Sequence, residues 1–156
     1  MQINTVGVIS DTHNLLRPAV LESLGGCDFI IHAGDITEPP IIERLNKIAP
    51  VKAVRGNNDK SVWATKTLPE YDVIDLDGCL IYVRHILGDM DLVPESAGIQ
   101  FVISGHSHKP EIIEKNGVTY LNPGSAGPRR FSLPISIAMM KKKQSGFSCE
   151  IIEFPS

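Results

Sequence analysis

The order of apolar strands and amphipathic helices over residues 2–59 is the feature that most constrains the fold. Residues 2–10, 28–32 and 51–54 are short runs rich in β-branched and apolar side chains, which are typical of buried strands. Between them, residues 15–24 and 39–49 repeat apolar side chains at helical spacing. A β-α-β-α-β order of this kind predicts a parallel sheet joined by right-handed crossovers.

The second half of the chain changes to hairpin signals. Asp77-Gly78 separates the apolar runs 73–76 and 80–83, and Asn116-Gly117 separates 112–114 from 118–121. Residues 101–104 form another predicted strand, and residues 135–140 and 148–152 are predicted to pair around a turn at Gly146. We therefore expect an α/β fold with two packed mixed β-sheets flanked by helices.

Length, charge and cysteine content narrow the class of protein. A chain of 156 residues has the size of one domain, so residues 1–156 are predicted to form a single domain. Fifteen Lys and Arg against 18 Asp and Glu leave a net charge of -3, which argues against general nucleic-acid binding. No apolar segment reaches membrane-spanning length, and no basic leader begins the chain, so we expect a cytoplasmic protein without a membrane partner. Cys27, Cys79 and Cys149 are predicted to be free thiols.

Polar clusters follow five of the predicted strands. They are Asp11-Thr12-His13, Gly34-Asp35, Gly56-Asn57, His85 and Gly105-His106-Ser107-His108. Because ligands of open α/β sheets bind at the carboxyl ends of the strands, these segments are expected to converge on one crevice. Their mixture of oxygen and imidazole donors suits Mn, Fe, Co, Ni or Zn. Each cluster alone is a weak signal, but all five in this order predict a metal site.

In these clusters the chain resembles the calcineurin-like metallophosphoesterases, and within them the small single-domain bacterial and archaeal phosphodiesterases. The family pattern of Asp-x-His, Gly-Asp, Gly-Asn, His and Gly-His-x-His matches the five clusters in order. The resemblance extends from about residue 6 to residue 125, where Asn122-Pro123-Gly124-Ser125 matches a loop of the small subfamily. It implies a metallophosphoesterase-like β-sandwich.

The resemblance also implies two divalent metal ions, with Mn²⁺ favoured and Ni²⁺, Zn²⁺, Fe²⁺ or Co²⁺ as alternatives. By similarity, the first ion is expected to take Asp11, His13, Asp35 and His108. The second is expected to take Asp35 as the bridge, with Asn57, His85 and His106. Phosphodiester hydrolysis would then use a metal-bridging hydroxide, with Asp35, Asn57 and His106 as catalytic residues. Two dications and two carboxylates leave a positive centre that attracts a small phosphate-ester substrate.

Two positions depart from the family pattern. Asn58 stands where many family phosphatases have a histidine that protonates the leaving group, and an amide cannot be a general acid. Substrates with good leaving groups are therefore expected, and the missing histidine resembles the small phosphodiesterases more than the phosphomonoesterases of the family. Ile86-Leu87 follow His85 where the family usually has Gly-His, which affects substrate preference more than metal binding. The residues predicted to bind substrate are Asn58, Asn122, Arg129 and Arg130, with a solvated loop as the alternative for the two arginines.

The sequence is also compatible with other functions. The same fold serves as a non-catalytic scaffold subunit in the retromer coat, and a phosphomonoesterase or a structural metal site would also use these residues. A homodimer is compatible with the β-rich second half. His32 is expected to be a buried hydrogen-bonded histidine rather than a ligand, and Asp59 is expected to orient its neighbours.

Overall fold

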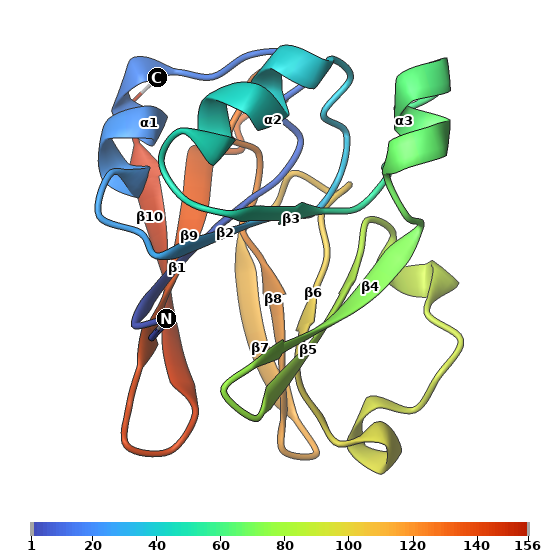
Figure 1. Cartoon of the computed structure of the whole chain (residues 1–156), viewed down its shortest axis with the longest axis vertical. Helices are drawn as coiled ribbons and strands as arrows, with labels where there is room; N and C mark the ends of the chain where they lie inside the picture. Colours follow the sequence, from blue (N-terminus) through green and yellow to red (C-terminus); the bar gives the residue numbers. More distant parts are fainter. Residues whose placement is uncertain (1, 156) are drawn as a thin grey trace.

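The first of two five-stranded β-sheets is built from both ends of the chain. This computed structural model describes residues 2–155. The strand order is β10-β9-β1-β2-β3, in which β1, β2 and β3 are parallel, β9 runs antiparallel to β1, and β10 antiparallel to β9 (Figure 1). The strands are β1 (Thr5–Ile9), β2 (Phe29–His32), β3 (Val51–Ala53), β9 (Ile135–Lys142) and β10 (Phe147–Phe154).

The second sheet is formed by the middle of the chain, in the order β4-β5-β6-β8-β7. Its strands are β4 (Tyr71–Leu76), β5 (Cys79–Arg84), β6 (Ile99–Ile103), β7 (Glu111–Lys115) and β8 (Val118–Asn122). The parallel strands β5, β6 and β8 are flanked by the antiparallel edge strands β4 and β7. Both predicted hairpins are present, and Asp77 and Asn116 each have the positive φ that begins a type I′ turn. The prediction of two packed mixed sheets is confirmed.

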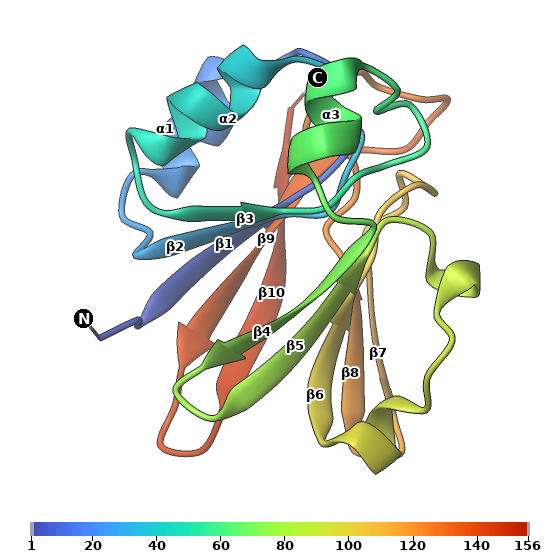
Figure 2. The ribbon, with the colours of Figure 1, turned by 45° about the vertical axis from the view of Figure 1, so that its right-hand side comes forward.

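The two sheets differ in the helices that cover their outer faces. Those of the described chain are α1 (Pro18–Leu24), α2 (Pro39–Asn46) and α3 (Val62–Thr67), with short 3-10 turns η1 (Leu87–Asp89) and η2 (Pro94–Ala97). Figure 2 shows α1 and α2 on the face of the first sheet that is turned away from the second sheet. The segment with η1 and η2 lies instead against the outer face of the second sheet, where Met90 and Leu92 pack against Tyr82 and Val102.

The main core lies between the two sheets. Val8 and Ile31 of the first sheet belong to one buried cluster with Ile81, Ile103 and Leu121 of the second. A second cluster lies beneath α1 and α2. Because each sheet is buried on its inner face by the other, the loops at the carboxyl ends of β1, β2, β5 and β6 are brought to a shared edge.

Some predicted boundaries were wrong. The helix predicted over residues 15–24 begins only at Pro18, because a residue before proline disfavours helical backbone, and Arg17 is extended. The helix predicted over residues 39–49 ends at Asn46. Helix α3 was not predicted, although its N-cap was visible in the sequence: the Ser61 side chain accepts a hydrogen bond from the Ala64 amide at 3.1 Å.

The three cysteines are free thiols, as predicted. Cys27 and Cys79 are buried free thiols, and Cys149 is a free thiol that is half-buried. None of the helices within residues 2–155 combines the length and the apolar character needed to cross a membrane.

Candidate metal centre

Two buried carboxylates lie at the shared edge of the sheets. Asp11, two residues after β1, is fully buried, and Asp35, three residues after β2, is 2% exposed. The loops that carry them are bonded together: the Asp11 amide donates to the Gly34 carbonyl at 2.9 Å, and the His13 amide donates to the Asp35 carbonyl at 2.9 Å. The parallel pairing of β1 with β2 therefore fixes one carboxylate beside the other.

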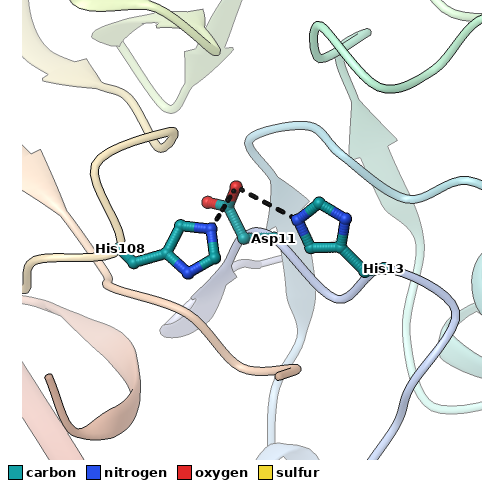
Figure 3. Close-up of side chains that lie close together, drawn as sticks. All are labelled: Asp11, His13 and His108. Atoms are coloured by element: carbon teal, nitrogen blue, oxygen red, sulfur yellow. Dashed lines mark ion pairs between the residues drawn. The ribbon is translucent and has the colours of Figure 1, made fainter. Parts of the chain in front are cut away.

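Two histidines approach Asp11 from opposite sides (Figure 3). His13 Nε2 lies 3.8 Å from Asp11 Oδ1, and His108 Nε2 lies 3.3 Å from the same oxygen. His13 comes from the loop after β1 and His108 from the loop after β6. The two rings have centroids 5.8 Å apart. Residues almost a hundred positions apart in the chain thus direct their nitrogens to one oxygen.

His85 joins the cluster with a defined tautomer. Its Nδ1 lies 2.7 Å from the Ala33 carbonyl oxygen, which can only accept, so Nδ1 carries the proton. Its Nε2 is thereby directed at the carboxylates, 3.2 Å from Asp35 Oδ2 and 3.7 Å from Asp11 Oδ1. A backbone carbonyl that orients a ring in this manner is typical of metal-ligating histidines.

The remaining two predicted ligands lie beside His85. His106 Nδ1 is 3.1 Å from Asn57 Oδ1, and the rings of His85 and His106 have centroids 5.4 Å apart. The four imidazoles therefore form two pairs, His13 with His108 and His85 with His106. This division agrees with the assignment of one pair to each of two ions, which remains a prediction.

The cluster has the properties of a cation site. Asp11 Oδ1, His13 Nε2 and His85 Nε2 are buried, without a hydrogen-bond partner, and directed at one another. The ion-pair partners found for Asp11 and Asp35 within residues 2–155 are all histidines. Asp11, His13 and His108 form one group whose ligand atoms lie within 4.8 Å of one another, and Asp11, Asp35 and His85 form another. Since unpartnered buried polar atoms are costly, the donors fit a bound divalent cation.

Electrostatics favour ionised carboxylates in this cluster. Burial alone would raise the pKa of Asp11, but its close approach to His108, His13 and His85 outweighs burial and holds that pKa far below its ordinary value. The pKa of Asp35 is also lowered, because contacts with His85 outweigh burial. The nearby Asp11 carboxylate raises the pKa of His13, and the pKa of His85 is raised by the carboxylates of Asp35 and Asp11, against the effect of burial. A divalent cation would therefore compete with protons at His13 and His85 but not at the carboxylates.

The backbone of the cluster is strained. Positive φ angles, which non-glycine residues rarely adopt, occur at five of the seven predicted ligands: Asp11, His13, Asp35, His106 and His108. Each such conformation costs on the order of 1 kcal/mol and is found chiefly at functional sites. The strain turns side chains from separate strands toward one point.

Two glycines allow the loops to approach closely. A Cβ on Gly56 would collide with Asp35 Oδ1 and with the Asp35 amide nitrogen. A Cβ on Gly105 would collide with Ser10 Oγ and lie 2.8 Å from Asp11 Oδ2. These glycines are needed for packing against the carboxylates rather than for a turn.

Asp59 supports the cluster more extensively than the sequence indicated. Its Oδ2 accepts from the amides of Asp35 at 2.9 Å and Gly56 at 2.8 Å. Its Oδ1 accepts from the amides of Ile36 at 2.9 Å and Thr37 at 2.7 Å. The buried carboxylate thus holds the loop after β2 to the loop after β3. Sequence reasoning gave Asp59 only a general orienting role, because these four amides are invisible without the fold.

Two of the predicted substrate-binding side chains are engaged within the protein. The Asn58 side-chain amide donates to Asp35 Oδ2 at 3.0 Å, and its backbone amide donates to Asp35 Oδ1 at 2.8 Å. The Asn122 side-chain amide donates to the Gly105 carbonyl at 3.0 Å and to Ser107 Oγ at 3.1 Å. Both asparagines therefore hold the loops of the predicted ligands in place.

Arg129, Arg130 and His32 surround the cluster, and His32 is buried and hydrogen-bonded as predicted. Arg129 and Arg130 line a cavity of about 270 Å³ together with His13 and His108. His32 is fully buried, and its Nδ1 accepts from the Gly34 amide at 3.1 Å while its Nε2 lies 2.9 Å from Thr12 Oγ1. Burial lowers the pKa of His32 to about 3, so it is neutral and structural.

Known proteins resemble this chain in sequence and in fold. Residues 5–145 match the calcineurin-like phosphoesterase superfamily domain. A probable metallophosphoesterase from Methanocaldococcus jannaschii is 36% identical over 128 residues, which cover 77% of this chain and 67% of that protein.

Two solved structures share the fold. A novel archaeal phosphodiesterase superposes with a TM-score of 0.77 at 20% identity, covering 95% of this chain and 99% of that one. Vacuolar protein sorting 29 from Cryptosporidium parvum gives a TM-score of 0.77 at 20% identity, covering both chains completely. The matches in sequence show that this chain belongs to the calcineurin-like phosphoesterase superfamily.

Proposed function

We propose that this protein is a dinuclear metal-dependent phosphodiesterase. The observation that carries the proposal is the set of unpartnered, inward-facing atoms around two buried carboxylates, Asp11 Oδ1 and the Nε2 atoms of His13 and His85. The proposed ligands of the first ion are Asp11, His13, Asp35 and His108, and those of the second are Asp35, Asn57, His85 and His106. Mn²⁺ is the favoured metal, with Ni²⁺, Zn²⁺, Fe²⁺ and Co²⁺ as alternatives. When bound, two such ions would acidify a shared water and polarise the phosphate oxygens.

The chain's own residues would position this chemistry. Asp35 lies between the two histidine pairs and is proposed to be shared by both ions, because its Oδ2 lies 3.5 Å from His13 Nε2 and 3.2 Å from His85 Nε2. Asn58 holds that carboxylate through two hydrogen bonds. His106 and Asn57 are exposed at the rim, where a phosphate ester could reach them. They are proposed to complete the catalytic set with Asp35.

A preference for diesters over monoesters is proposed because the position of the phosphatase histidine holds Asn58, which fits the small phosphodiesterases of the family better than its phosphomonoesterases. Asn58, which takes the position of the general acid in many family phosphatases, donates its amide to Asp35 and has no proton to give a leaving group near neutral pH. A leaving group that departs as a stable anion is therefore favoured. Arg129 and Arg130, beside His13 and His108, are proposed to bind a non-bridging phosphate oxygen or an ester group of the substrate.

A non-catalytic scaffold is the rival function, since this chain shares its fold with vacuolar protein sorting 29. The two functions differ in what they require of the cluster. A scaffold does not need unpartnered nitrogens and an ionised carboxylate pair directed at one point, whereas a phosphoesterase does. The cluster therefore favours the enzyme.

The test compares bis-p-nitrophenyl phosphate with p-nitrophenyl phosphate on chelator-treated protein, with and without Mn²⁺. The wild type is expected to cleave the diester only with metal and to cleave the monoester more slowly. Asp35→Asn and His106→Ala should each lower diester kcat/KM by at least about a hundredfold. Asp75→Asn, an exposed turn carboxylate on the distant β4–β5 hairpin, is the control and should keep wild-type activity. Folded wild type that cleaves neither ester with any of the five metals would instead support the scaffold.

A further inference from the structure

A large cavity opens beside the proposed metal centre, on the outer side of the second sheet. Its volume is about 650 Å³, within the range of small-molecule sites. One wall is the outer face of β7 and β8, with Ile113 and Tyr120. The other wall is the segment after β5, with Ile86, Leu87 and Met90. Of these residues, the sequence analysis named only Ile86 and Leu87, as a departure from the family pattern.

Two apolar side chains of this cavity are partly open to solvent. Leu87 is 43% exposed and Ile113 is 47% exposed. Met90 and Tyr120 pack against the neighbouring buried cluster of Tyr82, Val102 and Val118, but Leu87 and Ile113 are not among the side chains that cover it. Exposed apolar surface that faces a hollow rather than bulk solvent is typical of a binding site.

The cavity is continuous with the proposed active site. His106 and Gly105 belong both to the cavity wall and to the loop that carries two proposed ligands. That loop is tied to the segment after β5 by the Gly105 amide, which donates to the His85 carbonyl at 2.9 Å. A phosphate held near His106 would therefore direct one of its ester groups between Leu87 and Ile113.

We infer that this cavity, lined by Ile86, Leu87, Met90, Ile113 and Tyr120, binds an aromatic ester group of the phosphodiester substrate. The inference rests on the proposed function. Aromatic rings are favoured over sugars or short alkyl groups because Tyr120 and the thioether of Met90 line the walls, and aromatic side chains and thioethers both attract rings. His106 and Asn122 line the metal end of the cavity, where the phosphate would lie, and Lys115, which pairs with Val118, lies at the other end of β7.

The experiment keeps one leaving group and changes only the other ester. Phenyl p-nitrophenyl phosphate and methyl p-nitrophenyl phosphate both release p-nitrophenolate, so their kcat/KM ratio reports how the remaining group is bound. The phenyl-to-methyl ratio of the wild-type protein with Mn²⁺ is expected to exceed that of Ile113→Ser by roughly tenfold, for partial burial of one ring. Differences in intrinsic reactivity cancel in this comparison.

Ile112→Ser is the matched control. Ile112 is adjacent on the same strand and 41% exposed, but it points to the opposite face of β7 and does not line the cavity. It should keep the wild-type ratio. Leu87→Ser, on the opposite wall, should reduce the ratio as Ile113→Ser does, which guards against a local folding effect of one variant. The subsite would be overturned, with diester hydrolysis intact, if the phenyl-to-methyl kcat/KM ratio were the same in the wild type, Ile113→Ser and Leu87→Ser. It would also be overturned if Ile112→Ser lowered that ratio as much as the cavity variants do. If the Mn²⁺-loaded wild type hydrolyses neither ester, the proposed function is overturned, and the subsite with it.

A binding measurement provides a readout that does not depend on turnover. Phenylphosphonate and methylphosphonate cannot be hydrolysed at their carbon–phosphorus bonds, and Zn²⁺ is diamagnetic. With Zn²⁺-loaded protein, phenylphosphonate should shift the methyl resonances of Met90 and Ile113 but not that of Ile112, and methylphosphonate should leave all three near their starting positions. Shifts of equal size with both phosphonates would contradict an aromatic subsite.

Discussion

Replacement of Asp59 by asparagine should loosen the frame of the metal centre without touching a proposed ligand. The Asp59 carboxylate accepts four backbone hydrogen bonds, two at each oxygen. An asparagine keeps one acceptor oxygen and turns an NH₂ group toward two amide donors. Two hydrogen bonds are therefore lost, and the connection between the loop after β2 and the loop after β3 is weakened.

The magnitude follows from the number and kind of bonds. A hydrogen bond to a charged group contributes about 1.5 to 3 kcal/mol, so two of them at a site that is 2% exposed correspond to about 3 to 6 kcal/mol. Urea denaturation of the chelator-treated protein should show this decrease in the free energy of unfolding. Mn²⁺ affinity should fall as well, because Asp35 lies in one of the two loops.

Asp75→Asn is the control for this measurement. Asp75 Oδ1 accepts one hydrogen bond, from the Gly78 amide at 2.8 Å, in an exposed turn. Its replacement should cost less than about 1 kcal/mol. If Asp59→Asn unfolds at the same urea concentration as Asp75→Asn, the four amide bonds do not stabilise the fold and the reasoning is refuted.

Three further predictions concern the same region. Mn²⁺ at a hundred times its Kd should stabilise the wild type by about 2.7 kcal/mol and raise Tm by roughly 5 to 10 °C, an increase that Asp11→Asn should lose in a thermal melt. Gly56→Ala should cost about 1 to 3 kcal/mol in urea denaturation and weaken Mn²⁺ binding, because its Cβ collides with Asp35, whereas Gly26→Ala meets no atom within 4 Å. Burial keeps the pKa of His32 near 3, against 6.5 when unfolded, so its contribution to stability is lost as pH falls below 6.5. Between pH 7 and pH 5 this loss should be about 2 kcal/mol, and His32→Gln should lack it.

Each of these predictions has a result that contradicts it. A Tm that rises equally in Asp11→Asn would place the stabilising ion elsewhere. Equal stability of Gly56→Ala and Gly26→Ala would mean that the loop moves freely away from Asp35. Parallel pH profiles of the wild type and His32→Gln would show that His32 titrates alike in the folded and unfolded chain.

The sequence predicts the parts of this fold whose causes are local. Asp77-Gly78 and Asn116-Gly117 specify type I′ turns through two adjacent residues, so both hairpins were predictable. The polar clusters could be placed at one edge because the carboxyl ends of parallel strands meet there. Helix starts are less predictable: the apolar spacing extends back to Leu16, but Pro18 keeps Arg17 extended, so α1 begins three residues later than predicted.

Interactions between distant segments could not be predicted. The pairing of β1 with β9 joins Val6 to Met140 and depends on the whole chain being folded. The four amides that bind Asp59 come from loops that meet only in the fold. Likewise, the sequence shows that Ile86 and Leu87 are unusual after the proposed ligand His85, but only the fold shows that they line a cavity opposite β7 and β8.

Titration of the chelator-treated protein with Mn²⁺, followed at once by bound metal and by diester hydrolysis, tests the two-metal centre most directly. Two equivalents are expected to bind per chain, and hydrolysis of bis-p-nitrophenyl phosphate is expected to rise as the second equivalent binds. Asp35→Asn, which alters the proposed bridge, should bind fewer than two equivalents and remain inactive. Wild-type protein that binds two equivalents without hydrolysis, or hydrolyses the diester with no metal bound, would contradict the account.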